Sequence, residues 1–324
     1  MTAADLFKKI DALVEAYIAD MEKAERAIYL ANRNAILSAT RTVWDAAAIT
    51  PKKDADIGNV AYVSRAKAFK YGRMDKLNDL VGEEAKKAAI ADISNIEVNG
   101  VKLYTTQYNG YAWAYSQGYA LPITGGAKVK LVADALYSDF SGMVFDERIK
   151  KNLGVYADDI LGVVTRGLNQ GASYQRIAKE LEDAVNRQYK SALTVARTEG
   201  GRIQSRAYLD SLALLDEVGA EYGKMWDATI DDKTRALHQQ MDGKMADSDG
   251  VFHLPDGATG PAPRMTGSAR NDINCRCSAL TIINGQKPTE RRIRGEGIVP
   301  YETYTERLAR GGEIPMRDVK KARA

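Results

Sequence analysis

Apolar side chains recur every three or four residues in the first part of the chain, and between residues 5 and 48 they fall on one helical face. The stripe consists of Leu6, Ile10, Leu13, Val14, Tyr17, Ile18, Met21 and Ile28. Pro51 ends the pattern, because the residue before a proline is kept out of the helical region. The sequence therefore predicts a helix over residues 5–48. Its apolar face has two open roles: packing in the core of this protein, or docking a partner, since the helix is longer than a compact domain needs.

A second helical pattern covers residues 59–93, and the Asn99-Gly100 pair predicts a turn after it. Residues 104–123 then carry six aromatic side chains beside small residues, with no lysine or arginine among them. A site that stacks nucleic-acid bases also needs cations for the phosphates. We therefore interpret this stretch as a helix whose aromatic face packs against protein, either inside the chain or at a contact between subunits.

Turn-forming residues divide the remaining helical part of the chain. Pro122 with Gly125-Gly126 predicts a loop, and Gly219 predicts the end of a helix. Between these points the spacing of apolar residues predicts three helices, which are residues 146–171, a helix capped by Ser173, and residues 191–218.

Beyond Gly219 the pattern changes from helical to extended. We predict strands over residues 221–230 and 277–283, with a short helix through His238 between them. Helices followed by strands indicate the α+β class. The predicted fold is a mostly helical N-terminal half with long helices, then a small α+β domain and an extended tail.

Composition narrows the class of protein further. The chain has 324 residues, a net charge of +3 and two cysteines separated by one residue. Such a pair cannot build a disulfide framework, and a near-balanced charge argues against binding nucleic acid with the whole surface. We find neither a signal-peptide pattern nor an apolar run of membrane-spanning length, so we expect synthesis in a reducing cytoplasm.

Three motifs follow one another between Thr194 and Leu280, and together they carry a family resemblance. They are Ala196-Arg197-Thr198-Glu199 on a helix, Trp226-Asp227 followed by Asp231, Arg235 and His238, and Asn274-Cys275-Arg276-Cys277. Each motif alone is weak, but the three in this order resemble the C-terminal domain of the Mu F-like phage head morphogenesis (minor capsid) proteins.

Together with the resemblance, the chain pattern gives four regions, which are a helical partner-binding region (1–121), a linker (122–145), a Mu F-like domain (146–284) and a basic extended tail (285–324). The tail is predicted from composition, because its basic residues outweigh its acids and few apolar residues are present to anchor a core, as in a solvated end. The resemblance also implies a function. The implied function is that of a minor capsid protein in the virion of a tailed phage or prophage. Such a protein binds the portal vertex inside the head and assists assembly, DNA packaging and retention, or ejection.

The resemblance also implies partners and a location. The expected partners are the portal protein, the major capsid or scaffold protein, and packaged double-stranded DNA. We expect the chain in the host cytoplasm during assembly and afterwards in the head interior near the portal vertex.

Histidine and cysteine supply the candidate metal ligands. His238, Cys275 and Cys277 offer a nitrogen and two sulfur atoms, with His253 or an aspartate as a fourth ligand. Two side chains separated by one residue on a strand face the same way, so both sulfurs can reach one ion. A structural zinc ion is the cofactor that this set suggests. The alternative is that the cysteines are small buried side chains and that His238 hydrogen-bonds the cysteine segment.

Catalysis is the weaker interpretation of the same residues. A hydrolase acting during phage entry would use a metal, or His238 as a base oriented by Asp227 or Asp231. No Gly-x-Ser-x-Gly elbow is present in the sequence. We therefore predict that the chain is not an enzyme and assign no catalytic residues.

Two further groups of charged residues have open roles. Arg197, Glu199 and Arg235, with Arg202 and Arg206, are expected to form buried ion pairs between the long helix and the strands, with Glu199 better placed to pair with Arg202 or Arg206 than with Arg197. The tail residues are expected to contact a protein partner or DNA phosphates, which would make an internal DNA-binding protein the other alternative function. They are Arg291, Arg292, Arg294, Lys320 and Lys321.

Overall fold

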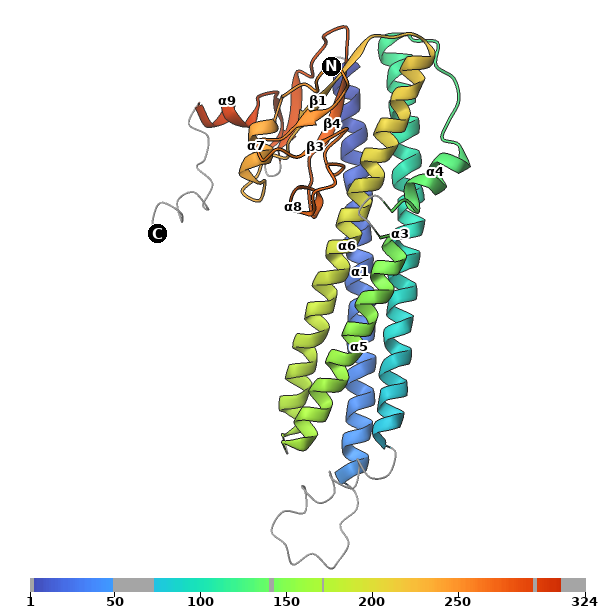
Figure 1. Cartoon of the computed structure of the whole chain (residues 1–324), viewed down its shortest axis with the longest axis vertical. Coiled ribbons are helices and arrows are strands. Elements are labelled where there is room, and N and C mark those ends of the chain that lie inside the picture. Colours follow the sequence, from blue (N-terminus) through green and yellow to red (C-terminus); the bar gives the residue numbers. More distant parts are fainter. Residues whose placement is uncertain (1–2, 49–72, 140–142, 171, 294–295, 310–324) are drawn as a thin grey trace, which may run out of the picture. The chain divides into compact units, whose positions relative to one another are not determined.

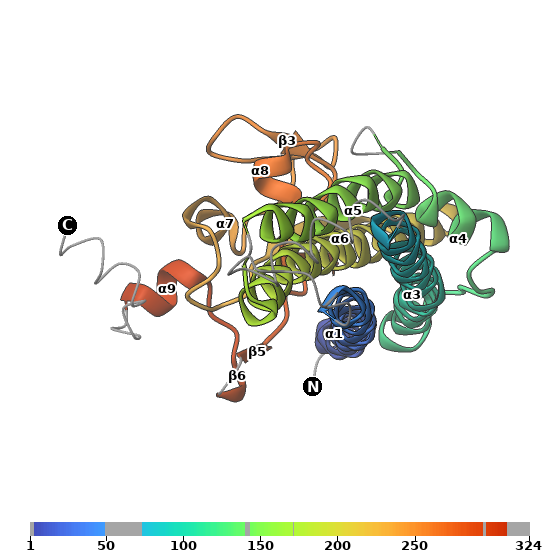
Figure 2. The ribbon, with the colours of Figure 1, turned by 90° about the horizontal axis from the view of Figure 1, so that it is seen from below.

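The computed structural model describes residues 3–48, 73–139, 143–170, 172–293 and 296–309 of the chain. Long helices come first in the sequence and short strands follow (Figures 1 and 2). The helices are α1 (Ala3–Ala48), α3 (Arg73–Tyr119), α4 (Val129–Leu136), α5 (Phe145–Asn169), α6 (Tyr174–Glu217), α7 (Ala236–Met241), α8 (Ala269–Asp272) and α9 (Tyr304–Ala309). The strands are β1 (Tyr222–Asp227), β2 (Phe252–His253), β3 (Thr259–Gly260), β4 (Ser278–Ile283), β5 (Glu290–Ile293) and β6 (Gly297–Pro300). The predicted α+β class is confirmed.

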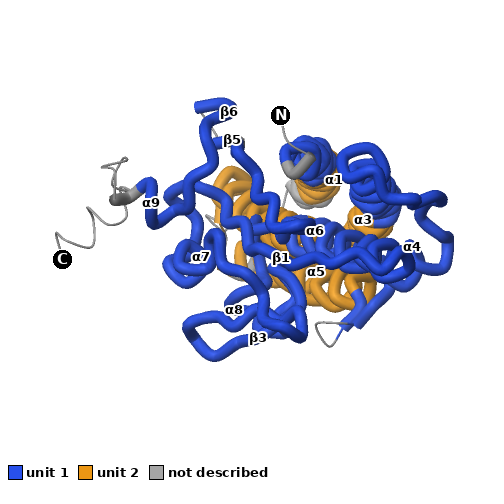
Figure 3. Tube along the Cα trace, turned by 90° about the horizontal axis from the view of Figure 1, so that it is seen from above, with its two compact units in different colours: residues 1–20, 97–144, 197–324 blue, residues 21–96, 145–196 orange. Residues whose placement is uncertain are grey.

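The described residues divide into two compact units (Figure 3). Unit 1 comprises residues 1–20, 97–144 and 197–324, and unit 2 comprises residues 21–96 and 145–196. Among the described helices, none is long and apolar enough to span a lipid bilayer.

Unit 2 is built from segments of α1, α3, α5 and α6, each of which contributes apolar side chains to one core. Its buried members include Ile36 of α1, Val81 of α3, Ile160 of α5 and Leu181 of α6. Helical segments that bury one face in this way gain most of their stability from packing rather than from intrinsic propensity.

Unit 1 holds all of the described strands, in three antiparallel pairs: β1 with β4, β2 with β3, and β5 with β6. In the first pair Trp226 lies opposite Ala279 and Asp227 opposite Ser278. The aromatic face predicted on residues 104–123 packs internally through four tyrosines, which are Tyr104, Tyr108, Tyr111 and Tyr115. The ring of Tyr111 lies 4.7 Å from that of Phe7 on α1.

The predicted turn at Asn99-Gly100 is wrong, because α3 runs through both residues. The glycine has a packing role instead. A Cβ atom at Gly100 would lie 2.5 Å from a methyl carbon of Leu136 and 3.0 Å from one of Ile203. A Cβ atom essentially never lies as close as 2.5 Å to a non-bonded carbon, so the missing side chain at Gly100 allows α4 and α6 to approach the helix closely. The part of the predicted second helix that covers residues 59–72 lies outside the described residues.

The helices predicted from Ser173 and over residues 191–218 form one continuous helix, α6. The cap at its start is confirmed, since Ser173 Oγ accepts a hydrogen bond of 3.3 Å from the backbone nitrogen of Arg176. The predicted end is also confirmed, because Gly219 has a φ of +65°, a value that favours glycine after a helix.

The prediction of a tail without a core after residue 285 is wrong for the described part of that segment. Residues 290–293 (β5) pair with residues 297–300 (β6) in antiparallel fashion, and α9 follows. Arg291, Ile293 and Tyr304 are buried. The average composition of this basic segment does not predict that these three side chains are buried, because the burial of each depends on the residues that it contacts.

Candidate metal centre and buried ion network

His238, Cys275 and Cys277 come together in the interior of unit 1. His238 lies on α7, and the two cysteines lie in the segment that leads into β4. The Sγ atoms of Cys275 and Cys277 are each 3.5 Å from Nδ1 of His238. All three side chains are buried, and their ligand atoms lie within 4.8 Å of one another. The chain therefore holds a compact, dry group of one nitrogen and two sulfur atoms.

The two thiols differ in pKa because Cys277 donates a hydrogen bond to Cys275. Hydrogen bonds from Cys277 and from His238 stabilise the thiolate of Cys275 and hold its pKa well below the usual value. The neighbouring Cys275 and burial raise the pKa of Cys277. The thiolate, rather than the thiol, is the form in which a cysteine binds a metal ion.

A shell of neighbouring residues fixes this group. The ring of Trp226 lies 5.5 Å from that of His238 in an edge-to-face arrangement. Arg264 donates from Nε to the carbonyl oxygen of Cys275 at 2.9 Å and from Nη1 to that of Gly201 at 3.1 Å. A Cβ atom at Gly201 would lie 2.6 Å from Cδ of Arg264. The second glycine after the Ala-Arg-Thr-Glu motif therefore leaves room for the arginine that holds the first cysteine.

His253, the fourth ligand expected from the sequence, is not part of the group. Its side chain is 62% exposed, and its Nε2 atom lies 2.6 Å from Asp247. The backbone of β2 sets this position, because Phe252 points inward and packs on Trp226. The next residue of a strand then points outward.

The motifs seen in the sequence hold the cysteine segment in place. Thr198 accepts a hydrogen bond from the backbone nitrogen of Asn274 at 3.2 Å, and Asn274 has a φ of +56°. Asp231 accepts two hydrogen bonds from the guanidinium of Arg276, one of 2.7 Å. Arg235 donates to the carbonyl oxygen of Ile273. The three motifs thus meet around one segment.

One of the ion pairs expected for the long helix is present, but both of its members lie on α6 itself rather than on the helix and a strand. Glu199 pairs with Arg202 at 2.7 Å, and both side chains are buried. Arg202 also donates to Ser138 and to the carbonyl oxygen of Leu136. Arg206 pairs with Asp210 instead. The contacts of Arg202 hold α6 against the end of α4 and against Ser138, which lies two residues beyond it.

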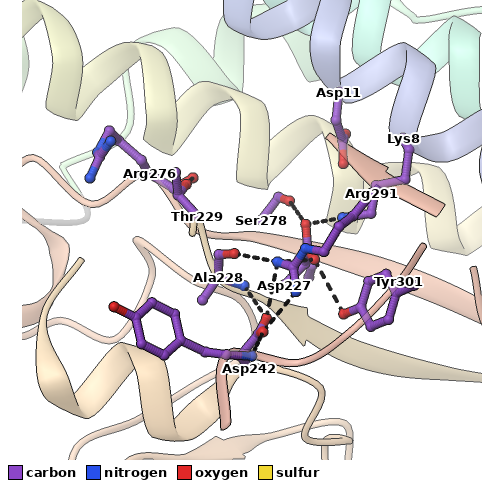
Figure 4. Close-up of polar contacts among 12 residues, drawn as sticks. Lys8, Asp11, Asp227, Ala228, Thr229, Asp242, Arg276, Ser278, Arg291 and Tyr301 are labelled. Carbon is purple, nitrogen blue, oxygen red and sulfur yellow. Dashed lines mark hydrogen bonds and ion pairs between the residues drawn. The ribbon is translucent and has the colours of Figure 1, made fainter. Parts of the chain in front are cut away.

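A buried ion network lies in the same unit as the metal-ligand group, and Figure 4 shows its polar contacts. Arg291 of β5 contacts two carboxylates, with 3.2 Å to Asp227 and 2.8 Å to Asp242. Lys8 of α1 pairs with Asp227 as well, and Tyr301 donates to it at 3.3 Å. The side chains of Arg291 and Asp242 are 3% and 0% exposed. We call these five residues the ion network.

Charge balance sets the acidity of the two aspartates. Burial alone would raise the pKa of Asp227, but the charges of Lys8 and Arg291 outweigh it and lower that pKa. Burial raises the pKa of Asp242, and Arg291 opposes this shift. Two cations and two anions therefore stabilise one another in the interior.

Sequence reasoning found Asp227 but missed Lys8, Asp242 and Tyr301, which stand alone in the sequence without a motif. It also placed Arg291 wrongly, because a buried arginine between two carboxylates cannot contact DNA phosphates or a partner. The side chain of Arg292, and all of Arg294, Lys320 and Lys321, lie outside the described residues.

Residues 158–280 match the family model of the Phage Mu protein F like proteins. This chain therefore carries a Mu F-like domain. The matched residues include the three motifs and the whole metal-ligand group, and they fall inside the region 146–284 expected from the sequence. The outer limits of that region remain a prediction.

Three relatives extend the comparison. The Minor head protein GP7 of Bacillus phage SPP1 is 28% identical over 255 residues, which are 74% of this chain and 80% of that protein. The NAD(+)--arginine ADP-ribosyltransferase EFV of Enterococcus faecalis is 39% identical over 153 residues, 46% of this chain. An uncharacterized protein of Haemophilus influenzae is 24% identical over 139 residues. The chain spans 31% of the transferase and 28% of the Haemophilus protein. No solved structure matches the chain.

Proposed function

We propose that this chain is a minor head protein that takes part in head morphogenesis of a tailed phage or prophage. One observation carries the proposal: the likeness to the SPP1 minor head protein covers most of both chains, and it comes with a Mu F-like domain. The buried organisation of that domain supports a role in binding and assembly, since its motifs hold one segment in place.

Within that role, we propose that the chain binds the portal vertex inside the head and assists assembly, DNA retention or ejection. Exposed apolar side chains on α3 of unit 1 support a docking role for the helical region. Val98, Val101 and Trp113 are 52%, 42% and 54% exposed, and their spacing places them on one side of the helix. Large exposed apolar groups that gather on one face are typical of interaction surfaces.

A mass-spectrometric inventory of purified particles and precursor heads tests this function. We expect this chain at a few to about a dozen copies per portal ring, the range that a ring of subunits at one vertex allows. A variant with Val98, Val101 and Trp113 replaced by serine should fold and be left out of particles. A control with Val155→Ser, an exposed residue of α5, should be incorporated normally. Absence of the wild-type chain from both particles and precursor heads would contradict the proposal.

The transferase activity named for the enterococcal relative is not part of this proposal. The likeness covers 31% of that protein, and a shared segment does not carry the chemistry of the whole chain. NAD consumption by the purified chain, compared with a buffer control, tests this point directly.

We also propose that the Mu F-like domain contains a structural zinc ion bound by His238, Cys275 and Cys277. A tetrahedral zinc ion, with Zn–S of about 2.3 Å and Zn–N of about 2.0–2.1 Å, separates sulfur from nitrogen by about 3.5–3.6 Å. Both sulfur–nitrogen distances in the group are 3.5 Å. Both distances therefore match the sulfur–nitrogen edges of a zinc tetrahedron, and an ion there would tie α7 to the segment before β4.

Metal analysis of the full chain tests the zinc proposal. We expect one zinc ion per chain, and its loss in Cys275→Ser and Cys277→Ser. His253→Ala is the matched control and should keep the ion, because His253 lies outside the group. A chain purified without chelator that contains no zinc and takes none up would exclude this cofactor.

A further inference from the structure

The metal-ligand group and the ion network share one short helix. Helix α7 has six residues, Ala236–Met241, and carries His238. Asp242 caps its C-terminal end. Besides its contact with Arg291, Asp242 accepts a hydrogen bond of 2.6 Å from the backbone nitrogen of Tyr304. We call residues 289–293 and 296–304 the C-terminal strap. The helix therefore connects the proposed zinc ligand to the contacts that hold the strap.

Strand β1 provides a second connection between the two sites. Trp226 packs on the ring of His238, and the next residue, Asp227, binds Arg291 of the strap. The backbone of Trp226 also pairs with the chain just after Asp242, through hydrogen bonds of 2.8 Å to Gly243 and to Lys244. A shift of α7 would therefore also move Asp227 and Asp242, the two carboxylates that bind Arg291.

A helix as short as α7 does not form by itself in water, because the first turn fixes several residues for a single hydrogen bond. It is ordered by what it is attached to at each end. If metal binding at His238 orders the helix, less conformational entropy is lost when the strap binds at Asp242, and the reverse also holds. The two binding events are therefore positively coupled. Such coupling is reciprocal by thermodynamic necessity.

We infer that metal binding at His238, Cys275 and Cys277 and docking of the C-terminal strap reinforce each other. The metal-bound domain holds the strap in place, and the metal-free domain releases it. This inference rests on the proposed zinc ion and adds a consequence to it: the position of the strap, and so the presentation of this end of the domain to a partner, depends on the metal.

Hydrogen exchange of the full wild-type chain tests the first half of the coupling without any substitution. The chain is compared in excess zinc and after removal of zinc by a chelator. We expect the amides of the strap to exchange faster without zinc, and those of α5 in unit 2 to be unchanged. Equal exchange of the strap in both states overturns the inference.

The reciprocal half is tested by the zinc affinity of Arg291→Lys, measured by competition with a chromogenic chelator. This variant keeps the charge and loses the contact with two carboxylates at once, and we expect its affinity to fall about 5- to 150-fold, the usual range of coupling between sites. Arg187→Lys, in an exposed pair with Asp159, is the matched control and should bind zinc as the wild type does.

The outcomes separate the two proposals. A wild-type chain that binds one zinc ion, with unchanged strap exchange and unchanged affinity in Arg291→Lys, contradicts the coupling and leaves the zinc ion in place. A chain that binds no zinc contradicts both. Neither result bears on the particle inventory, which tests the head protein function by itself.

Discussion

Each unit buries a pair of carboxylates, and the two units stabilise them differently. In unit 1, Asp227 and Asp242 lie beside Lys8 and Arg291. In unit 2, Glu25 of α1 and Asp92 of α3 hydrogen-bond to each other, and Asn95 donates to Glu25 at 2.7 Å. The first pair is matched by two cations. The second pair shares a proton.

The difference appears in the acidity of the four groups. The cations lower the pKa of Asp227 despite its burial. In unit 2, burial and the neighbouring Glu25 raise the pKa of Asp92 to about 8. The cations beside Asp227 favour its charged form, whereas the raised pKa of Asp92 makes the stability of its unit depend on pH.

Removal of the central cation should have the largest effect. In Arg291→Met the two aspartates keep their burial and lose their shared partner, so the free energy of unfolding should fall by about 3–5 kcal/mol. Urea unfolding followed by circular dichroism measures this change. A loss below about 1 kcal/mol would show that Lys8 and solvent replace Arg291, and that the network does not hold the strap.

The acid pair of unit 2 should respond to pH in a defined direction. The folded-state pKa of Asp92 is raised, so the folded state binds more protons than the unfolded state between about pH 4 and 8. Stability is then fully present below the unfolded pKa and falls as the pH rises, until it levels off above the folded pKa. Tyr29 of α1 and Tyr156 of α5 line the same pocket, and burial raises the pKa of both phenols.

Asp92→Asn tests this direction, because asparagine imitates the protonated acid. We expect the variant to be more stable than the wild type at pH 8, by on the order of a few kcal/mol, and equal to it near pH 4. Unfolding midpoints across this pH range are the measurement, with Asp159→Asn at an exposed position as control. If the stabilities of the wild type and Asp92→Asn change in parallel between pH 4 and 8, the shared proton is excluded.

A third solution to burying charge occurs at Arg264, which is 4% exposed. The described hydrogen-bond acceptors of its guanidinium are neutral oxygens, among them the carbonyls of Cys275 and Gly201, while its charge interacts with Glu15 and Cys275. Gly201→Ala should displace this arginine and cost about 1–3 kcal/mol, as overpacking of a core does. The exposed Gly154 of α5 is the matched control, since nothing lies within 4 Å of its added Cβ. There alanine should stabilise the helix by about 0.5–1 kcal/mol.

These buried charges mark what the sequence could and could not predict. Helix existence followed from apolar spacing, as in residues 5–48, and the gathering of His238 with both cysteines followed from the motifs. Gly100 led to a wrong prediction of a turn, and Gly201 led to no prediction. A glycine required for close packing cannot be distinguished in the sequence from one in a turn. Lys8 and Arg291 are far apart in sequence, and their meeting at Asp227 depends on tertiary packing that no local pattern contains. For the same reason, composition alone predicted a solvated tail where the strap is buried.

The smallest effect is expected where the same substitution meets an exposed pair. Arg187 and Asp159 of unit 2 lie 3.3 Å apart with side chains 59% and 48% exposed. Water solvates both charges there, so Arg187→Met should change the free energy of unfolding by less than about 0.5–1 kcal/mol. Measured under the same urea conditions as Arg291→Met, it isolates burial as the variable, because the two substitutions remove the same group from an aspartate. Equal losses in both variants would mean that the lost arginine side chain itself, rather than the buried carboxylates left behind, determines the stability.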